Sequence, residues 1–444
     1  MLPAGVVRVA AQAVPPRPLG AELPAWRAAG DEREMRIENP TGQVTLREAL
    51  ALALMHSPDL AAFAWETRAR EARLLQAGLL PNPVFSVQAE DLGRSTDAAS
   101  GRGLLQPQAT IQLSQLIELG GKRAARQRLA QSHQQLAEWD FEAARLDVLT
   151  RVSQAFVGVL ANQQTLALAE EAMRLGDEMR QIVATRVEAG VVSPIEQTRA
   201  EVALATLRID VERARRALDA ERLRLALLWG GSNAQFAAAV GELTTPAMLP
   251  PLSALMERLA ANPDLERWVA ETSQRQAALA LERSRRTPEV TVHAGYRRFT
   301  TIDTNALLIG ASIPLPFFDR NQGAIREAAD RVGKAGEEQR AAEARVRAAL
   351  GESYRALATA HDEAEAISVQ LLPGARATFD AVSEGYRLGR FAYLDVLDAQ
   401  RTLLTANSQY LRALSDYHHA IVDVERLIGM PLSMVPATGS AVVK

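Results

Sequence analysis

The chain consists of two related halves, and this duplication constrains its fold more than any single motif. Ser57-Pro58-Asp59-Leu60 returns as Asn262-Pro263-Asp264-Leu265, 205 residues later. Further along, Gly190 corresponds to Gly389 at an offset of 199 residues. The offsets differ because one loop of the first half is longer. The chain therefore holds two copies of one structural unit.

Each half has the pattern of a helix, two strands, a long helix and a further helix. A period of 3.6 residues predicts a helix from Thr45 to about Leu80, and Thr45 and Glu48 form a capping box at its start. This helix ends at Pro81-Asn82-Pro83, because proline lacks a donor and restrains the residue before it.

Strict alternation of apolar and polar residues follows each of these first helices. It predicts one β-hairpin at about 83–119 and a second at about 288–316, with strands of about 10 residues. Beyond the hairpins, the stretches 123–187 and 322–387 read as helices of about 65 residues, on the order of 100 Å long. Pro373-Gly374 predicts a kink in the second one. Such long helices indicate an elongated helical assembly.

The repeat divides the chain into five parts. We expect a flexible, proline-containing segment at 1–43, the first repeat at 44–230, a linker at 231–251, the second repeat at 252–432 and a flexible tail at 433–444. The first segment shows no complete secretory signal, which needs a basic start and an uninterrupted apolar stretch. We expect the start to be truncated or a signal to have been removed.

Composition excludes several functional classes. The 444 residues carry 50 basic and 53 acidic side chains and a formal charge of −3, which argues against nucleic acid as a partner. Cysteine is absent, which removes thiolate metal sites and lipid attachment to cysteine. The 6 histidines show no metal-ligand spacing, and no nucleophile–base pair or phosphate-binding loop stands out. We expect no enzyme activity, no cofactor and no resident metal.

The strands have the length and pattern of membrane-crossing β-strands. Four strands cannot close a barrel, and an open edge in lipid leaves backbone groups unpaired. Three chains would supply twelve strands around a lumen lined by Gln88, Gln112, Arg297 and His293. The alternative that stays open from the pattern alone is a pair of ordinary hairpins capping a coiled coil.

Three further motifs carry a family resemblance together with Pro81-Asn82-Pro83. They lie at Gln115–Arg123, Ile313–Gly323 and Tyr386–Gln400. In this order and in a duplicated frame, they resemble the outer-membrane efflux proteins of the TolC family over Val44–Leu432. The stretch from Phe318 to Gly323 is most similar to the branch that serves heavy-metal exporters of the cobalt-zinc-cadmium and copper-silver type.

The resemblance implies a mainly α fold with a membrane β-barrel contribution. It implies a homotrimer whose twelve-stranded barrel lies in outer-membrane lipid and continues into a periplasmic helical tunnel. It also implies two protein partners, a periplasmic adaptor (membrane fusion protein) and an inner-membrane pump of the resistance-nodulation-division kind. A duct for type I secretion or drug efflux remains an alternative, and so does a soluble periplasmic scaffold or adaptor.

The resemblance also points to a gate near the end of the tunnel. Asp395 and Asp398 share one helix face, and in a trimer they would form two carboxylate rings that attract cations. In the family, aspartates at these positions form the constriction, and a tyrosine and an arginine help to hold it closed. Tyr386 matches the tyrosine, whereas Phe391 occupies the arginine position and Arg390 lies one place earlier. Acidic residues also favour the first turn of any helix, so a capping role stays open.

Two helix–helix turns mark the tips where an adaptor would dock. The first comprises Gly190, Ser193 and Pro194, and the second comprises Gly389, Phe391 and Ala392, the two sets that we expect to contact the adaptor. Glycine ends a helix in the left-handed conformation, and Ser193 or Pro194 starts the next helix.

Overall fold

The computed structural model describes most of the chain after residue 40. The described residues are 18–19, 22–23, 40–90, 107–244, 248–299 and 303–436. Most of the N-terminal segment expected to be flexible, the turn of the first hairpin and most of the tail after 433 therefore lie outside the described residues.

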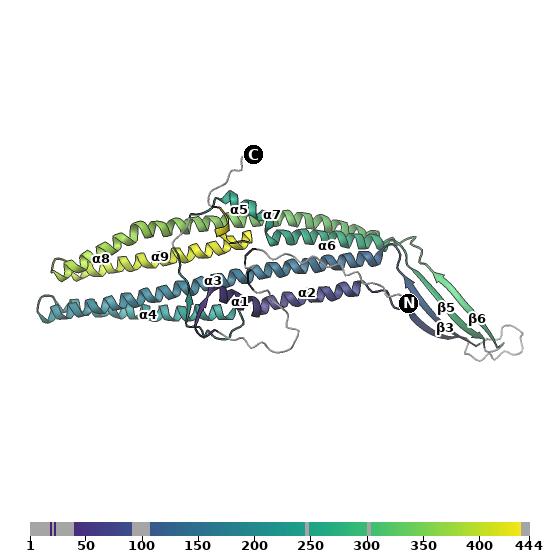
Figure 1. Cartoon of the computed structure of the whole chain (residues 1–444), viewed down its shortest axis with the longest axis horizontal. Coiled ribbons are helices and arrows are strands. Elements are labelled where there is room, and N and C mark those ends of the chain that lie inside the picture. Colours follow the sequence, from purple (N-terminus) through teal and green to yellow (C-terminus); the bar gives the residue numbers. More distant parts are fainter. Residues whose placement is uncertain are drawn as a thin grey trace. The chain divides into compact units, whose positions relative to one another are not determined.

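The chain folds as two compact units, each of which combines parts of both sequence halves (Figure 1). We call the unit formed by Glu66–Trp139 and Arg267–Arg340 the sheet unit. The helix unit contains Val14–Trp65, Asp140–Glu266 and Ala341–Lys444. Within the described residues, no helix has a stretch long and apolar enough to cross a membrane.

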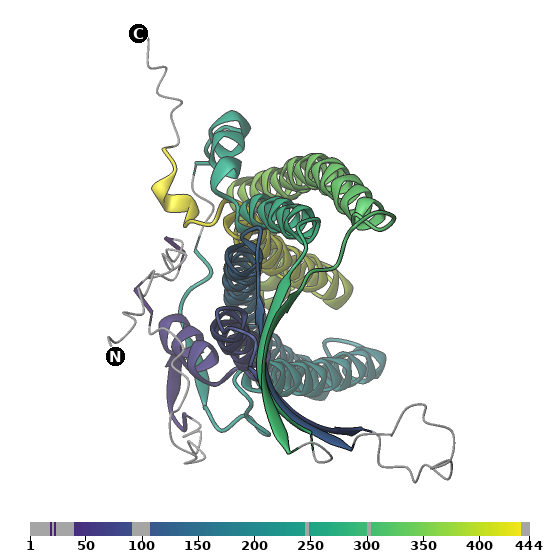
Figure 2. The same cartoon turned by 90° about the vertical axis from the view of Figure 1, so that its right-hand side faces the viewer.

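The sheet unit contains one antiparallel sheet with the order β2-β3-β5-β6. Its strands are β2 (Val84–Glu90), β3 (Gln108–Ile117), β5 (Val290–Phe299) and β6 (Thr304–Ser312). Both predicted hairpins are present, and β3 pairs with β5 to join them into a single curved sheet (Figure 2). Among the described strands, β2 and β6 have no partner on their outer edges.

The register puts apolar and polar side chains on opposite faces of this sheet. Val87, Ile111, Tyr296 and Leu307 lie opposite one another along one row, and all four side chains are exposed. The next row belongs to the other face and contains Gln88, Thr110 and Arg297. There the Arg297 Nε donates to the Thr110 hydroxyl at 3.0 Å. The predicted alternation is therefore confirmed.

Four helices contribute to the sheet unit, and the buried side chains that they place there are mostly small. These helices are α2 (Pro58–Ala77), α3 (Lys122–Glu188), α6 (Pro263–Arg285) and α7 (Gln322–Ala366). Ala77, Ala125, Ala130, Ala137, Ala328 and Ala335 are buried. Several large apolar side chains of this unit, among them Phe85, Val87, Ile111 and Leu307, are exposed on the sheet instead.

The segment that is predicted as one helix, from Thr45 to about Leu80, forms two helices in the structure. The capping box of Thr45 and Glu48 starts α1 (Leu46–His56) as expected, but the helix stops at Ser57 and α2 begins at Pro58. Proline has no N–H and disfavours a helical residue before it, so the helix breaks although the apolar period continues. In the second half, Asn262-Pro263 separates α6 from the short helices α5 (Leu252–Arg258) and η1 (Leu259–Ala261).

The linker between the two halves contains an additional strand. Strand β4 (Ala238–Val240) pairs in parallel with β1 (Gln43–Thr45). Nearby, Trp229 and Phe236 are buried in the largest apolar cluster of the helix unit, with ring centroids 6.2 Å apart. The linker is therefore packed against the first repeat.

The second long helix is irregular just before Pro373, where a kink is predicted. After α7 comes a π-helical turn, η2 (Ile367–Leu371), and α8 (Leu372–Arg387) continues the helix. A proline removes one intrahelical hydrogen bond, and a π turn accommodates that loss without ending the helix. The remaining helices are α4 (Pro194–Leu227), α9 (Tyr393–Ile428) and η3 (Leu432–Met434).

Candidate functional site

The two helix–helix turns of the helix unit have the same backbone geometry. Gly190 and Gly389 adopt left-handed φ values of 70° and 76°. At the first tip, the amide of Gly190 donates to the Val187 carbonyl and that of Val191 to the Arg186 carbonyl, both at 2.9 Å. These two bonds define a Schellman motif, which requires a residue free to adopt positive φ.

The second tip repeats these bonds. The amide of Gly389 donates to Tyr386 at 2.9 Å and that of Arg390 to Gly385 at 2.7 Å. The Phe391 ring lies against Gly385, where an added Cβ would overlap it. The predicted glycine turns are thus confirmed at both tips, and the second tip also has an aromatic cover.

The helices that leave the tips start with different caps. At α4, the Ser193 hydroxyl accepts a bond from the Ile195 amide at 3.4 Å, and Pro194 occupies the first turn. At α9, the cap position is Ala392, whose amide donates to the Asp395 carboxylate at 2.9 Å. Asp395 therefore has the helix-capping role that the sequence left open.

Asp395 and Asp398 line one groove on the surface of the second tip. Both are exposed and lie on the same side of α9, facing α8 across a groove of about 570 Å³. Phe391, Thr378 and Thr402 also line it. The structure thus brings the two predicted carboxylates together with Phe391. Two carboxylates in an open groove attract cations.

Tyr386 is a core residue of the tips. It is 1% exposed, and its ring centroid lies 5.9 Å from that of Tyr393. The Arg186 guanidinium lies 4.5 Å from the Tyr386 ring centroid and donates to the Tyr386 carbonyl. Tyr386 therefore ties α3 of the first tip to α8 of the second.

The Tyr386 hydroxyl lies in a buried, acidic environment. The Tyr386 hydroxyl and Oε2 of Glu196 are both buried, and neither makes a hydrogen bond of regular geometry among the described residues. Burial and then the Glu196 charge raise the pKa of Tyr386, although the Arg186 charge lowers it. Burial, followed by Tyr386 and Glu196, raises the pKa of Tyr393 to about 12.

The cation next to Tyr386 is Arg186 rather than Arg390. Arg390 is exposed, and within the described part of the chain its side chain has no hydrogen bond or ion pair. Arg186 was not among the residues predicted from the sequence. Its signal was a basic residue in the last turn of a helix, four positions before Gly190, where a cation complements the helix dipole.

Apolar side chains project from both tips. Val191 and Ile195 on the first tip are 62% and 54% exposed, and Leu388 and Leu394 on the second are 61% and 52% exposed. Apolar groups clustered on an exposed surface are typical of protein–protein contacts. The tips therefore present a surface suited to a partner.

Three histidines of the helix unit, His361, His418 and His419, lie beside polar groups of the protein. His418 and His419 contact the carbonyls of Thr244 and Gln154, at 3.3 and 3.0 Å. His361 lies with Asp362 and Glu365 on one turn of α7, and one potential ligand atom from each falls within 4.8 Å of the others. The two carboxylates are exposed, a common arrangement without a metal, and we assign no metal site there.

Comparison with known proteins places this architecture in a family. Residues 49–231 and 254–430 match the family model described as outer membrane efflux protein. The cobalt-zinc-cadmium resistance protein CzcC of Cupriavidus metallidurans is 35% identical over 388 residues, covering 87% of this chain and 90% of CzcC. The nickel-cobalt-cadmium resistance protein NccC of Alcaligenes xylosoxydans xylosoxydans is 29% identical, covering 67% of this chain and 66% of NccC.

Solved structures share the fold at low sequence identity. A membrane protein from Pseudomonas aeruginosa superimposes with a TM-score of 0.74 at 18% identity, covering 91% of this chain and 96% of the other. The CusC structure gives a TM-score of 0.72 at 15% identity, covering 92% and 99%.

Proposed function

This chain belongs to the outer membrane efflux protein family, and we propose that it forms a trimeric, gated channel that exports heavy-metal cations. The family resemblance read from the sequence is confirmed, and so is the location in the outer membrane. A soluble periplasmic scaffold is therefore no longer an alternative. The trimer, the gate, the partners and the cargo are our proposals, and each has its own support.

The open sheet supports a trimer. Strands β2 and β6 each have an unpaired outer edge among the described strands, and the row from Val87 to Leu307 exposes apolar side chains. An unpaired edge in lipid costs several kcal/mol for each unsatisfied backbone group. Pairing β6 of one chain with β2 of the next removes both edges. Three chains would then form a barrel of twelve strands, with Gln88 and Arg297 facing its lumen.

The groove at the second tip supports a cation-attracting gate. Three copies of Asp395 and Asp398 would place six carboxylates around the trimer axis. Rings of carboxylates select cations in channels. Tyr386 and Arg390 would lie beside these rings, Tyr386 as the anchor that fixes the tip and Arg390 as a cation free to pair across the trimer. We infer a passive conduit that catalyses no reaction and holds no cofactor.

Exposed apolar groups at both tips support docking of a periplasmic adaptor. We propose that Gly190, Ser193 and Pro194 shape the first contact, and that Gly389, Phe391 and Ala392 shape the second. The adaptor would connect the channel to an inner-membrane pump of the resistance-nodulation-division kind. The cobalt-zinc-cadmium and nickel-cobalt-cadmium resistance proteins among the relatives support metal cations as cargo.

A second cargo class has support from another relative. The pyoverdine export outer membrane protein OpmQ of Pseudomonas aeruginosa is 26% identical over 434 residues. That relative exports an organic molecule, so the same fold accommodates other cargo. The higher identity to CzcC is the observation that favours metal cations.

The proposal is tested by reconstituting the purified protein in planar bilayers and by deleting its gene. We expect a heat-modifiable trimer with cation-selective conductance, and a deletion strain with lower tolerance to cobalt, zinc and cadmium but unchanged tolerance to drugs. A protein that stays soluble without detergent and forms no channels would contradict the channel. Loss of drug tolerance alone would contradict the metal cargo.

A further inference from the structure

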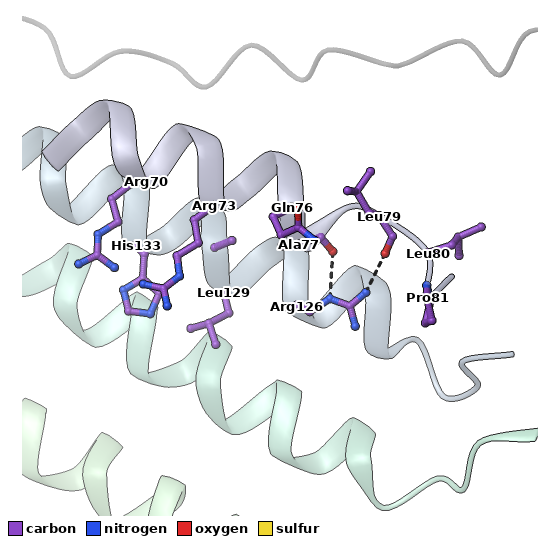
Figure 3. A pocket seen from close by; sticks show the side chains of 11 residues that line it. Arg70, Arg73, Gln76, Ala77, Leu79, Leu80, Pro81, Arg126, Leu129 and His133 are labelled. Atoms are coloured by element: carbon purple, nitrogen blue, oxygen red, sulfur yellow. Dashed lines mark hydrogen bonds between the residues drawn. The ribbon is translucent and has the colours of Figure 1, made fainter. Parts of the chain in front are cut away.

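A basic groove lies at the end of α2, immediately before the first strand of the sheet. It has a volume of about 610 Å³ and lies entirely within the sheet unit. Its lining includes Arg70, Arg73, Leu79, Leu80, Leu129 and His133. Figure 3 shows the side chains of Arg70 and Arg73 on α2 directed toward His133 on α3.

A third arginine of this groove serves to hold its shape. Arg126 donates to the carbonyls of Ala77 and Leu79 at 3.0 and 3.2 Å (Figure 3), and both its terminal nitrogens contact the Glu118 carboxylate. Arg123 donates to the Gly78 carbonyl at 2.7 Å. These bonds satisfy carbonyls at the end of α2, which otherwise lack partners. Arg126 is therefore fully engaged and fixes one wall of the groove.

Arg73 supplies the uncompensated positive charge. Arg70 pairs with Glu66 on the same helix at 2.6 Å, but Arg73 has no hydrogen bond or ion pair within the described residues. Burial, and then the charges of Arg70, Arg73 and Arg275, lower the pKa of His133. The lowered pKa favours the neutral ring of His133, so the positive charge of the groove comes from its arginines. The groove therefore presents the guanidinium of Arg73, which has no partner among the described residues, beside that of Arg70, whose ion pair is with Glu66.

The groove continues into an apolar surface that leads to the sheet. Leu75, Leu79 and Leu80 are 72%, 51% and 64% exposed. Beyond Pro81, Phe85 is 66% exposed and begins the apolar face of β2, on which Val87 follows. A cationic pocket next to an exposed apolar strip fits a molecule with an anionic head and apolar chains.

We propose that this groove binds an anionic phospholipid, with its phosphate on Arg70 and Arg73 and its acyl chains along Leu79, Leu80 and the apolar face of the sheet. The proposal rests on the proposed function, because it assumes that this face of the sheet contacts the lipid of the outer membrane. Basic residues beside a membrane-embedded surface bind anionic lipid headgroups. The phosphate would lie at the level where the lipid-facing surface ends and the helices begin.

Native mass spectrometry of the detergent-solubilised trimer tests this site. The probes are phosphatidylglycerol and phosphatidylcholine, which share acyl chains but differ in net charge. The variants are Arg70→Gln with Arg73→Gln, and Leu79→Asn with Leu80→Asn. The matched control is Arg68→Gln on the same helix, because Arg68 does not line the groove. The arginine variant should lower the preference for phosphatidylglycerol about fivefold for each arginine, the factor that corresponds to about 1 kcal/mol per basic residue.

Three other results would overturn the proposal. The first is an unchanged lipid preference in the arginine variant, or an equal loss in Arg68→Gln. The second is displacement of the lipid by inorganic phosphate together with no effect of the leucine variant, which would identify a phosphate site. The third is protection of Arg73 from phenylglyoxal in lipid-free trimers, which would show that a neighbouring chain fills the groove. Conductance of the same preparations reports the proposed channel separately, so a failure of the lipid site is distinguishable from a failure of the channel.

Discussion

The two helix tips have the same backbone geometry but different side chains. Gly190 and Gly389 close identical hydrogen-bonded turns, 199 residues apart. At the positions of Asp395 and Asp398, the first tip has Glu196 and Arg199. The first tip thus carries one negative and one positive side chain at these positions, whereas the second tip carries two negative ones. Duplication preserved the turn and left the side chains free to diverge, so we place the gate in the second tip.

A second difference concerns what each tip contributes to the shared core. Tyr386 of the second tip is buried against Tyr393 and under the Arg186 guanidinium. Its counterpart in the first half is Val187, which is only partly buried. The second tip therefore anchors the first, and mutations at corresponding positions should have unequal effects.

The largest effect is expected from removing this anchor. Tyr386→Ala should destabilise the tips by about 3–5 kcal/mol, the range for truncating a buried aromatic side chain. Val187→Ala should cost about 1 kcal/mol, because it removes less buried volume. Hydrogen–deuterium exchange of the peptides around 179–200 and 379–406 reports the local opening free energy. Equal costs at the two positions would mean that the tips are equivalent.

Replacing the glycine of either turn should lower the stability of its tip by a similar amount. Gly190→Ala and Gly389→Ala each place a Cβ on a left-handed residue, which costs about 1–2 kcal/mol. The control is Gly351→Ala within α7, where a Cβ meets nothing within 4 Å and should stabilise the helix by about 1 kcal/mol. The same exchange measurement applies. A cost at only one tip would contradict the shared backbone geometry.

An effect confined to high pH is carried by Tyr393. Its pKa is raised from 10 to about 12, so the neutral form is favoured in the folded tip. The stability that this group contributes is complete below pH 10 and is lost as the pH rises through 12. In an ultraviolet titration of the 6 tyrosines, one tyrosinate signal should appear near pH 12 and disappear in Tyr393→Phe. A titration that is unchanged in this variant would place the shifted group elsewhere.

Local signals in the sequence predicted much of the fold. The capping box at Thr45, the left-handed glycines and the alternating strands depend on neighbouring residues, and the structure contains all of them. The break at Ser57 was missed because the apolar period runs on past Pro58. The pairing of β3 with β5 was also missed, because it joins segments more than 170 residues apart.

For the candidate site, too, local sequence signals predicted neighbouring residues but not contacts between distant segments. Asp395 and Asp398 were found because they lie three residues apart on one helix. The contact of Arg186 with Tyr386 joins two separate helix hairpins, and no periodicity within either hairpin encodes it. The groove around Arg73 was missed for a similar reason, since it forms only where the end of α2 packs on α3.

The conductance of an Asp395→Asn/Asp398→Asn variant in planar bilayers tests the account most directly. Asparagine keeps an oxygen that can accept the Ala392 amide bond, so the variant removes charge while keeping the cap. The controls are Asp416→Asn, on an exposed part of α9, and Glu196→Gln/Arg199→Gln, which leaves the net charge of the first tip unchanged. We predict that only the second-tip variant strongly raises conductance and loses cation selectivity. Unchanged conductance and selectivity in this variant, or equal changes in the first-tip control, would contradict a gate at the second tip.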